Sequence, residues 1–310
     1  MRLLALVIST GLLAACSAGD LAVNSTSQIL LEAQPSMQQE ADYELAKQAI
    51  PGALKTVESF WITGYGNSGA HARLEKILTE GFCQYATGFV EDDWEEAKFR
   101  KDLPAIEYHN ARASHIFTRC LNYALRTLGS RWQKELFGTT DEATKLINDT
   151  GSGQRFAMLF AGNALGSLIN HNLNRPEMLS YVSTVQMIMQ HIVDLDKKNG
   201  PPANKVHAAL PYIALGMIAS TKPKSMGGDP DAAKAYFQKA LDITEGKFLL
   251  ARTFMAYRVG LQTNDEKFFH EELVKVLDTP PSVWPEQRLA NEIAHRRARR
   301  YLSHEKELFQ

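Results

Sequence analysis

The chain has 310 residues, of which 34 are Lys or Arg and 35 are Asp or Glu, so that its formal net charge is only -1. This balance excludes the global basic field that binds nucleic-acid backbones, and no nucleic-acid partner is expected. A hydrophobic share of 45% with only three cysteines is typical of a globular protein without a dense disulfide framework.

The N-terminal segment has the features of a bacterial export signal. Arg2 is followed by an apolar run over residues 3–15, which suits a signal peptide but is too short to span a bilayer. The run ends at Cys16, and the small residues before it resemble a lipobox, in which the cysteine sulfur receives a diacylglycerol. We therefore expect residues 1–15 to be removed and Cys16 to become a lipidated N-terminus.

The residues after Cys16 are expected to form a tether. Aspartate in the next position is the usual signal for retention in the inner membrane. Ser17 stands there instead, which favours the outer membrane and a protein that faces the periplasm. Residues 16–40 are rich in Ser, Ala, Asn and Gln, which indicates a flexible linker. The chain would then contact the membrane through its lipid anchor only.

The rest of the chain is predicted to be all-α. Apolar residues recur at spacings of three and four, and strict alternation is not sustained anywhere. We expect residues 41–310 to form one domain of stacked antiparallel helical hairpins, as a solenoid or bundle. The expected helices are Tyr43–Thr63, Ser68–Asp93, Pro104–Gly129, Gln154–Asn170, Arg175–Asp196, Asn204–Ser220, Asp229–Thr244, Phe248–Leu261, Asp265–Leu277 and Pro285–Leu308.

One helix pair carries a tetratricopeptide-like pattern. Ala233, Phe237 and Ala240 follow the small–aromatic–small spacing of a second repeat helix, and Gly216 fits the signature of the first helix. The loop between the two helices is longer than a standard repeat allows. Pro211 is a further irregularity, because a proline within a helix is expected to kink or shorten it.

The long loop is the most distinctive motif. Residues 222–230, with Gly227, Gly228, Asp229 and Pro230, resemble the signature loop of the T component associated with tripartite ATP-independent periplasmic (TRAP) transporters. If Gly228 needs a positive φ angle, its replacement by valine should destabilise this loop. Further similar stretches are Phe60–Asp92, Arg112–Leu128, Arg288–Asn291 and Arg296–Ala298.

The resemblance implies a function as an interaction protein. Members of that family are lipid-anchored periplasmic proteins of tetratricopeptide-like architecture. They work beside the solute-binding subunit of a TRAP transporter and can self-associate. Such helices offer concave surfaces on which another protein can be held. No cofactor and no enzymatic activity are expected. The alternative is a lipoprotein that binds a small apolar ligand and passes it on.

Two short motifs match the residue spacing of catalytic or cofactor sites but lack the surrounding sequence that such sites need. Gly64 to Gly69 satisfy the spacing of a dinucleotide fingerprint, but a helix precedes them where that fingerprint needs a strand. Asp149 to Ser152 match half of an aspartic-protease signature, and no second copy exists. Both are better explained as turns between helices. The nine histidines form no motif with metal-ligand spacing, so no metal site is predicted.

Two cysteines remain once Cys16 is lipidated. Cys83 and Cys120 could pair in an oxidising compartment, but both lie in apolar helical stretches. The sequence leaves their redox state open, and buried free thiols are the favoured interpretation.

An aromatic stripe offers one candidate binding site. Phe82, Tyr85 and Phe89 are spaced three and four apart, which places them on one face of a helix. They could line a cleft for an apolar ligand. Packing into the core is the simpler explanation.

A basic run near the C-terminus offers the second candidate site. It includes Arg296, Arg297 and Arg300, and Glu292 is one turn before Arg296, within reach of an ion pair. A solvent-exposed face is the simpler interpretation. The alternative is that Arg297 and Arg300 dock an acidic partner surface.

Overall fold

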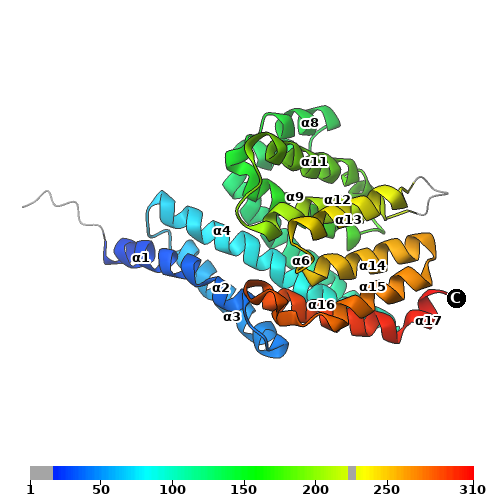
Figure 1. The fold of residues 1–310 in the computed structure, drawn as a ribbon. Coiled ribbons are helices and arrows are strands. Elements are labelled where there is room, and N and C mark those ends of the chain that lie inside the picture. The colour runs from blue at the N-terminus through cyan, green and yellow to red at the C-terminus, as the bar shows by residue number, and fades with distance from the viewer. Residues whose placement is uncertain (1–16, 223–227) are drawn as a thin grey trace, which may run out of the picture.

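The computed structural model describes residues 17–222 and 228–310, and all regular structure in these two ranges is helical (Figure 1). The predicted all-α fold is thereby confirmed. The elements are α1 Ala18–Ala33, α2 Pro35–Gln38, α3 Tyr43–Ile62, α4 Ser68–Tyr85, η1 Ala86–Val90, α5 Glu91–Phe99, α6 Leu103–Leu128, α7 Ser130–Glu135, α8 Thr140–Asn148, η2 Ser152–Gln154, α9 Arg155–Asn170, α10 Pro176–Leu179, α11 Val182–Asn199, α12 Lys205–Ala219, α13 Pro230–Ile243, α14 Leu249–Thr263, α15 Glu266–Asp278, η4 Pro281–Val283, η5 Pro285–Gln287, α16 Arg288–Ser303 and α17 Glu305–Leu308.

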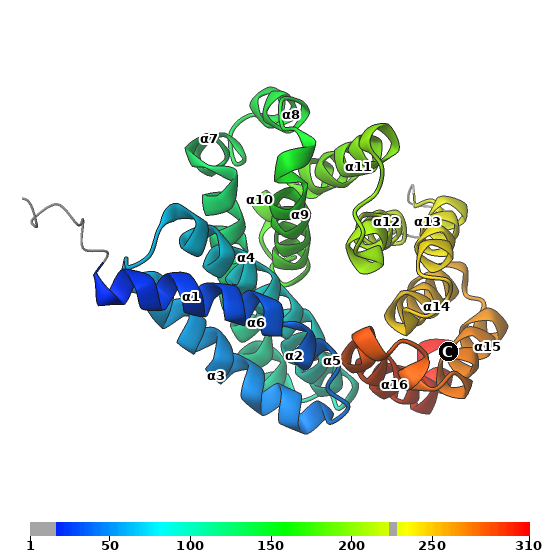
Figure 2. The same cartoon turned by 60° about the vertical axis from the view of Figure 1, so that its left-hand side comes forward.

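The long helices stack mainly on their neighbours in sequence. α3 packs on α4, α4 on α6, α6 on α9, and the series continues through α11, α12, α13, α14 and α15 to α16. The stack curves, and in Figure 2 its C-terminal part comes round toward the N-terminal helices. α16 accordingly contacts α2 and α3. The predicted stacked hairpins therefore form a strongly curved solenoid.

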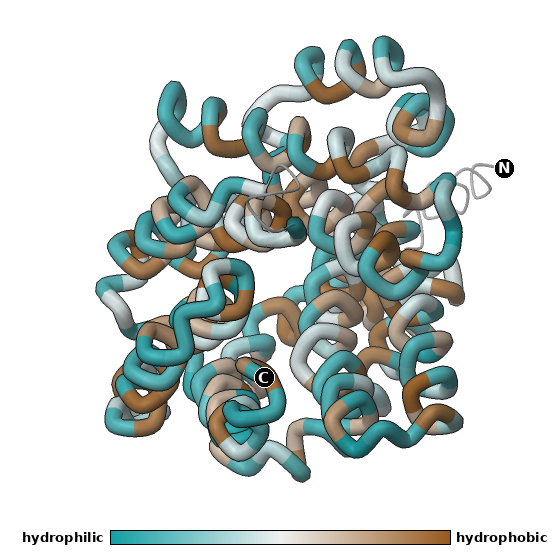
Figure 3. The backbone as a smooth tube through the Cα atoms, turned by 90° about the vertical axis from the view of Figure 1, so that its right-hand side faces the viewer, coloured by the Kyte–Doolittle hydropathy of each residue, from teal (hydrophilic) through white to brown (hydrophobic). Residues whose placement is uncertain are grey.

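Most of the helices have a hydrophobic and a hydrophilic face. In Figure 3, hydrophilic and hydrophobic residues alternate along the tube within single helices. This pattern is typical of helices that bury one stripe and expose the other to water. No helix within the described ranges has both the length and the apolar character needed to cross a bilayer.

The tetratricopeptide-like residues pack as their spacing predicts. Ala233, Phe237 and Ala240 are fully buried on α13. A Cβ atom on Gly216 of α12 would lie 3.0 Å from the ring of Phe237. Because glycine has no side chain at this point, the aromatic ring can occupy the space between the two helices.

Pro211 does not shorten its helix, contrary to expectation. α12 continues through Pro211 as far as Ala219. Proline lacks the N–H that would donate to the carbonyl oxygen of His207, four residues earlier. Arg155 replaces this donor, because its Nη2 lies 3.0 Å from the His207 oxygen. A neighbouring helix thus supplies the hydrogen bond that the proline removes.

The predicted helix Ser68–Asp93 is longer and is interrupted. α4 passes through the π-helical segment η1 into α5, which ends at Phe99. Within η1, a Cβ atom on Gly88 would lie 2.9 Å from Ile293 of α16. The small residue therefore allows the C-terminal helix to approach this segment closely.

The flexible tether predicted over residues 16–40 is wrong from Ser17 onward. Ser17 and Asp20 form a capping box, and α1 follows it. Asp20 Oδ1 accepts the backbone N–H of Gly66 at 2.8 Å, and Asn24 Oδ1 accepts that of Asn67 at 2.9 Å. The polar residues of this segment therefore cap α1 and bind it to the loop before α4. The helical body begins at Ala18 and not at residue 41. Cys16 and the predicted signal peptide lie outside the described residues.

The interpretation of Cys83 and Cys120 as free thiols is also wrong. A disulfide joins them and links α4 to α6, with their Cα atoms 5.4 Å apart. Both residues are buried, as predicted. The sequence could not show that two residues on different helices face each other across the interface.

We predict that removing this disulfide lowers the free energy of unfolding. The bond closes a loop with a sequence separation of 37 residues, and a loop of this size restricts the unfolded chain. The double variant Cys83→Ala and Cys120→Ala should lose about 3–4 kcal/mol in urea unfolding. Equal stability of the variant and the oxidised parent would show that the bond does not form in the purified protein.

Candidate functional site

A buried ion cluster joins the two ends of the helical stack. Asp92 of α5 is fully buried. Its carboxylate accepts from Arg296 Nε and from Arg300 Nη2, each at 2.6 Å. The hydroxyl of Tyr43 on α3 donates to the same carboxylate at 3.1 Å. One acidic side chain therefore connects α3, α5 and α16.

Glu95 extends the cluster along α5. Its Oε2 accepts from Arg300 Nη2 at 2.7 Å and from the hydroxyl of Tyr301 at 2.9 Å. Arg297 is only 1% exposed, and its Nη2 donates to the carbonyl oxygen of Thr87 in η1 at 2.7 Å. The basic run of α16 is thus held by acidic residues that are about two hundred positions away in the sequence.

The charges in this cluster compensate one another. Burial alone would raise the pKa of Asp92, but the nearby Arg300 and Arg297 outweigh it and hold the pKa below its usual range. Burial, together with Glu95, raises the pKa of Tyr301 well above its usual value. The Tyr301 hydroxyl therefore stays protonated and donates to Glu95.

The predicted docking role of Arg297 and Arg300 is contradicted by this geometry. Both guanidinium groups are directed at α5 and are not available to another protein. The simpler interpretation, a solvent-exposed basic face, is also wrong at these two residues. Glu292 pairs with Arg288 and not with Arg296. The acidic run of residues 91–96 was the signal in the sequence that could have identified the true partner.

The aromatic stripe lies in the core. Phe82, Tyr85 and Phe89 are all buried. The ring of Phe82 stacks on Tyr123 of α6 at 6.1 Å, and that of Phe89 lies 5.0 Å from Tyr43. Neither cavity described below is lined by these side chains. The structure thus shows the core packing that the spacing also predicted.

The glycine loop is partly described. Gly227 lies outside the described residues. Asp229 caps α13 by accepting the N–H of Ala232 at 2.9 Å, and the buried Pro230 begins that helix. The φ angle of Gly228 is not in the left-handed region. A Cβ atom there would instead lie 1.8 Å from the carbonyl oxygen of Lys222, so close approach of the backbone is what requires glycine.

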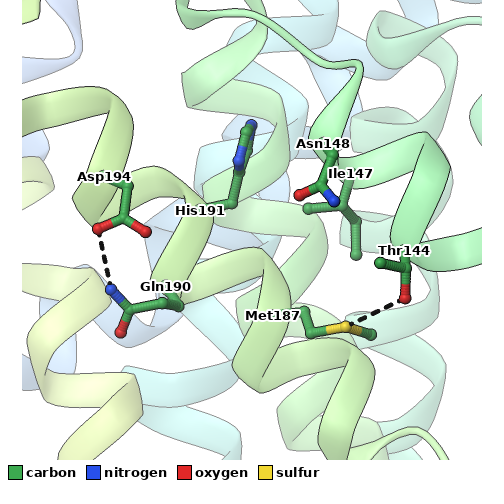
Figure 4. Close-up of a pocket in the computed structure, with 7 residues that line it drawn as sticks. All are labelled: Thr144, Ile147, Asn148, Met187, Gln190, His191 and Asp194. Carbon is green, nitrogen blue, oxygen red and sulfur yellow. Dashed lines mark hydrogen bonds between the residues drawn. The ribbon is translucent and has the colours of Figure 1, made fainter. Parts of the chain in front are cut away.

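A small cavity of about 190 Å³ lies between α8 and α11 (Figure 4). Thr144 donates to the sulfur of Met187 at 3.4 Å, and Gln190 donates to Asp194 at 3.1 Å. The Nε2 atom of His191 is 2.8 Å from the carbonyl oxygen of Thr150. These side chains are bonded to one another or to the backbone, and they do not form a nucleophile–base pair. The remaining lining residues are Ile147 and Asn148.

A second, open depression of about 360 Å³ lies between α15 and α17. It is lined by Glu266, Lys267, His270, Glu271 and Glu305. The ring of His270 pairs with Glu305 at 2.9 Å. Across residues 17–222 and 228–310, no group of three or more His, Cys, Asp or Glu side chains is placed to hold a metal ion.

The two formal catalytic motifs are turns, as predicted. Gly64 and Gly66 have φ angles of 71° and 96° in the connection between α3 and α4. Asp149 caps the end of α8. Thr150 is buried, and its hydroxyl accepts from the indole N–H of Trp132 at 3.0 Å.

Three exposed apolar side chains lie at one end of the helical layer. Leu103 and Tyr108 lie near the start of α6 and are 71% and 64% exposed. Leu173, which follows α9, is 59% exposed. α6 and α9 are antiparallel here, because Asn110 Nδ2 donates to the carbonyl oxygen of His171 at 2.7 Å. We call Leu103, Tyr108 and Leu173 the distal face, and sequence reasoning missed it because exposure depends on packing.

Comparison with known proteins identifies one family. The family model described as TRAP transporter T-component matches residues 39–309. No curated protein shows significant sequence similarity to the chain.

We predict that Asp92→Asn strongly destabilises the protein. The substitution leaves the arginines around Asp92 without their shared counter-charge, and breaking a buried pair costs about 3–5 kcal/mol. Denaturant unfolding at neutral pH measures this loss. Glu96→Gln is the control. Glu96 pairs with Arg296 at 2.8 Å but is one-third exposed, so the loss should stay below about 1 kcal/mol.

The same variant tests the pH dependence. The pKa of Asp92 is depressed in the folded state, so its stabilising contribution is complete above the unfolded pKa of about 4. The contribution is lost as the pH falls through the lower folded value. The difference in stability between the parent and Asp92→Asn should therefore shrink below about pH 4. A difference that stays constant down to pH 2 would contradict the assigned role of the carboxylate.

We predict that Gly228→Val lowers the melting temperature. The new Cβ would overlap the oxygen of Lys222, which also accepts from Gln262 Nε2 at 2.7 Å and cannot move without breaking that bond. The expected cost is about 1–3 kcal/mol. Gly151→Val is the matched control, since a Cβ at Gly151 meets nothing within 4 Å. Equal melting of both variants would show that the loop can adjust.

Proposed function

The chain belongs to the TRAP transporter T-component family, and on this premise we propose that it is a lipid-anchored periplasmic scaffold for such a transporter. The scaffold binds the solute-binding subunit and assists solute uptake. The family match over residues 39–309 is the observation that carries the proposal. Membership of the family implies association with TRAP transporters. Lipid anchoring and binding of the solute-binding subunit are supported by further features of the sequence and the structure.

Export and lipidation are supported by the N-terminal sequence. The apolar run of residues 3–15 and the small residues before Cys16 suit a lipoprotein signal. The disulfide between Cys83 and Cys120 agrees with an oxidising compartment such as the periplasm. Ser17 favours the outer membrane over the inner membrane.

The distal face is the surface that we assign to the solute-binding subunit. It lies at the end of the helical layer away from Ser17, the first described residue. Thr127 near the end of α6 bonds to Glu75 near the start of α4, whereas Arg112 near the start of α6 bonds to Tyr85 at the end of α4. α6 has 26 residues and spans about 39 Å, which separates its two ends widely. Exposed Leu and Tyr side chains supply the apolar contact area that a protein interface requires.

The chemistry of the chain supports an accessory role. T components are accessory parts of transporters, and the polar side chains of the small cavity bond to one another and to the backbone. The alternative function, transport of a small apolar ligand by the lipoprotein itself, would need a lined cavity. Phe82, Tyr85 and Phe89 were its candidate lining, and they fill the core. No observation therefore favours the ligand carrier.

We predict that the distal face is required for capture of the solute-binding subunit. Reversible cross-linking in the native bacterium, followed by affinity capture of the full chain, should enrich a TRAP solute-binding protein that mass spectrometry identifies. The variant Leu103→Ser with Tyr108→Ser should weaken binding of that purified subunit by about tenfold or more, because truncating interface anchors typically costs over 1 kcal/mol each.

The matched control is Leu21→Ser with Ile62→Ser. These side chains are as exposed as those of the distal face but lie near the start of α1 and the end of α3. Binding should be unchanged in this control. Equal loss in both variants would contradict the assigned surface. Capture of copies of the chain alone, with no solute-binding protein, would contradict the proposed partner.

A further inference from the structure

A second group of exposed apolar side chains surrounds the start of α1. Leu21 in its first turn is 65% exposed, Ile62 at the end of α3 is 67% exposed, and Tyr65 in the following loop is 48% exposed. We call these three residues the N-terminal tip. The start of α1 lies at the left-hand end of the view in Figure 1, beside the start of α4.

The tip is one connected structure. A Cβ atom on Gly19 would lie 2.9 Å from the ring of Tyr65, so this ring covers the first turn of α1. The hydrogen bonds from Gly66 to Asp20 and from Asn67 to Asn24 fix the helix to the loop. Leu21, Ile62 and Tyr65 therefore lie at the same end of the molecule, with Leu21 and Tyr65 on different sides of α1.

The carboxylate of Asp20 lies beside these side chains and is held by hydrogen bonds. Asp20 is the acidic residue in the first turn of α1. Its carboxylate accepts from the backbone N–H of Gly66 and from the hydroxyl of Ser17 at 2.8 Å. These hydrogen bonds, the one from Gly66 first, lower the pKa of Asp20. The carboxylate is thus engaged in fixing the loop.

The anchor leaves almost no free chain. Ser17 is the N-cap of α1 and directly follows Cys16. Consecutive Cα atoms are about 3.8 Å apart, so a lipidated Cys16 would hold the first turn at the level of the lipid headgroups. The backbone of Leu21 donates to Ser17 O at 3.1 Å, which continues the rigid connection into the helix.

We propose that the N-terminal tip rests in the headgroup region of the bilayer and fixes the orientation of the whole protein. The proposal rests on the lipidation of Cys16 proposed above. Leu21 and Ile62 bury apolar surface at the boundary of the acyl chains, and Tyr65 has the amphipathic ring that is favoured at membrane interfaces. The distal face is then held away from the membrane, toward the periplasm.

Photolabelling from the bilayer tests this orientation. The full-length lipoprotein is purified with its acyl chains and reconstituted into vesicles of phosphatidylethanolamine and phosphatidylglycerol that contain a phospholipid with a diazirine near the headgroup. Mass spectrometry then locates the label. We expect labelling at Leu21, Ile62 and Tyr65 to exceed that at Leu103 and Tyr108 by about fivefold or more, because membrane contact is confined to the tip.

Two variants show whether the side chains themselves set the orientation. In the variant Leu21→Ser, Ile62→Ser and Tyr65→Ser, the ratio of tip to distal labelling should fall toward one. In the control Leu103→Ser with Tyr108→Ser it should stay high. An unchanged ratio in the tip variant would overturn the proposal. So would labelling of Ile29, eight residues further along α1, as strong as that of Leu21, since α1 would then lie flat on the membrane.

Two further outcomes distinguish a failure of the proposed tip orientation from a failure of the proposed lipid anchor. A mature protein whose mass lacks acyl chains refutes the anchor. An acylated protein with even labelling over its surface refutes the tip alone.

Discussion

The carboxylate of Asp92 is the point on which the curved architecture depends. It is fully buried at the junction of α5 with α16 and is bound by Arg296 and Arg300. A buried charge is tolerated only when opposite charges and hydrogen bonds compensate it. The compensating arginines are on α16, near the C-terminus. Asp92 can be buried with its charge compensated only if α16 packs against the N-terminal helices. The cluster thereby specifies where the solenoid ends.

Close packing of a side chain against the backbone of the neighbouring helix is the second constraint, and glycine allows it at two contacts. Gly216 makes room for Phe237 between α12 and α13, and Gly88 makes room for Ile293 between η1 and α16. Pro211 has no N–H to donate to the carbonyl oxygen of His207. Arg155 of the neighbouring helix α9 donates to that oxygen in its place. Contacts between helices therefore keep the helices regularly stacked, even where a helix contains a residue that disfavours helical structure.

Two groups of exposed apolar residues lie at opposite ends of the molecule, and we propose a different function for each. The N-terminal tip lies beside the predicted lipid attachment, and the distal face lies at the other end of the layer formed by α4, α6 and α9. A rigid body between a membrane and a partner can hold the partner at a fixed height, and the disulfide between α4 and α6 stiffens this layer. Such a spacer role agrees with an accessory component of a transporter, whose task is positioning and not chemistry.

The sequence by itself determined the positions of most long helices after residue 42, the all-α fold, the family and the turns at Gly64 and Asp149, because each of these depends on local spacing, capping and backbone conformation. Tertiary structure alone decided the roles of Arg297, which is buried against α5, and of Cys83, which is paired with a residue on another helix. Polar residues 17–37 were mistaken for a tether because a short amphipathic helix and a flexible linker share a similar composition, and only packing onto α4 separates them. The physical reason is common to all three: burial, pairing and exposure are properties of contacts between segments that are distant in the sequence, and local pattern contains no information on which segments meet.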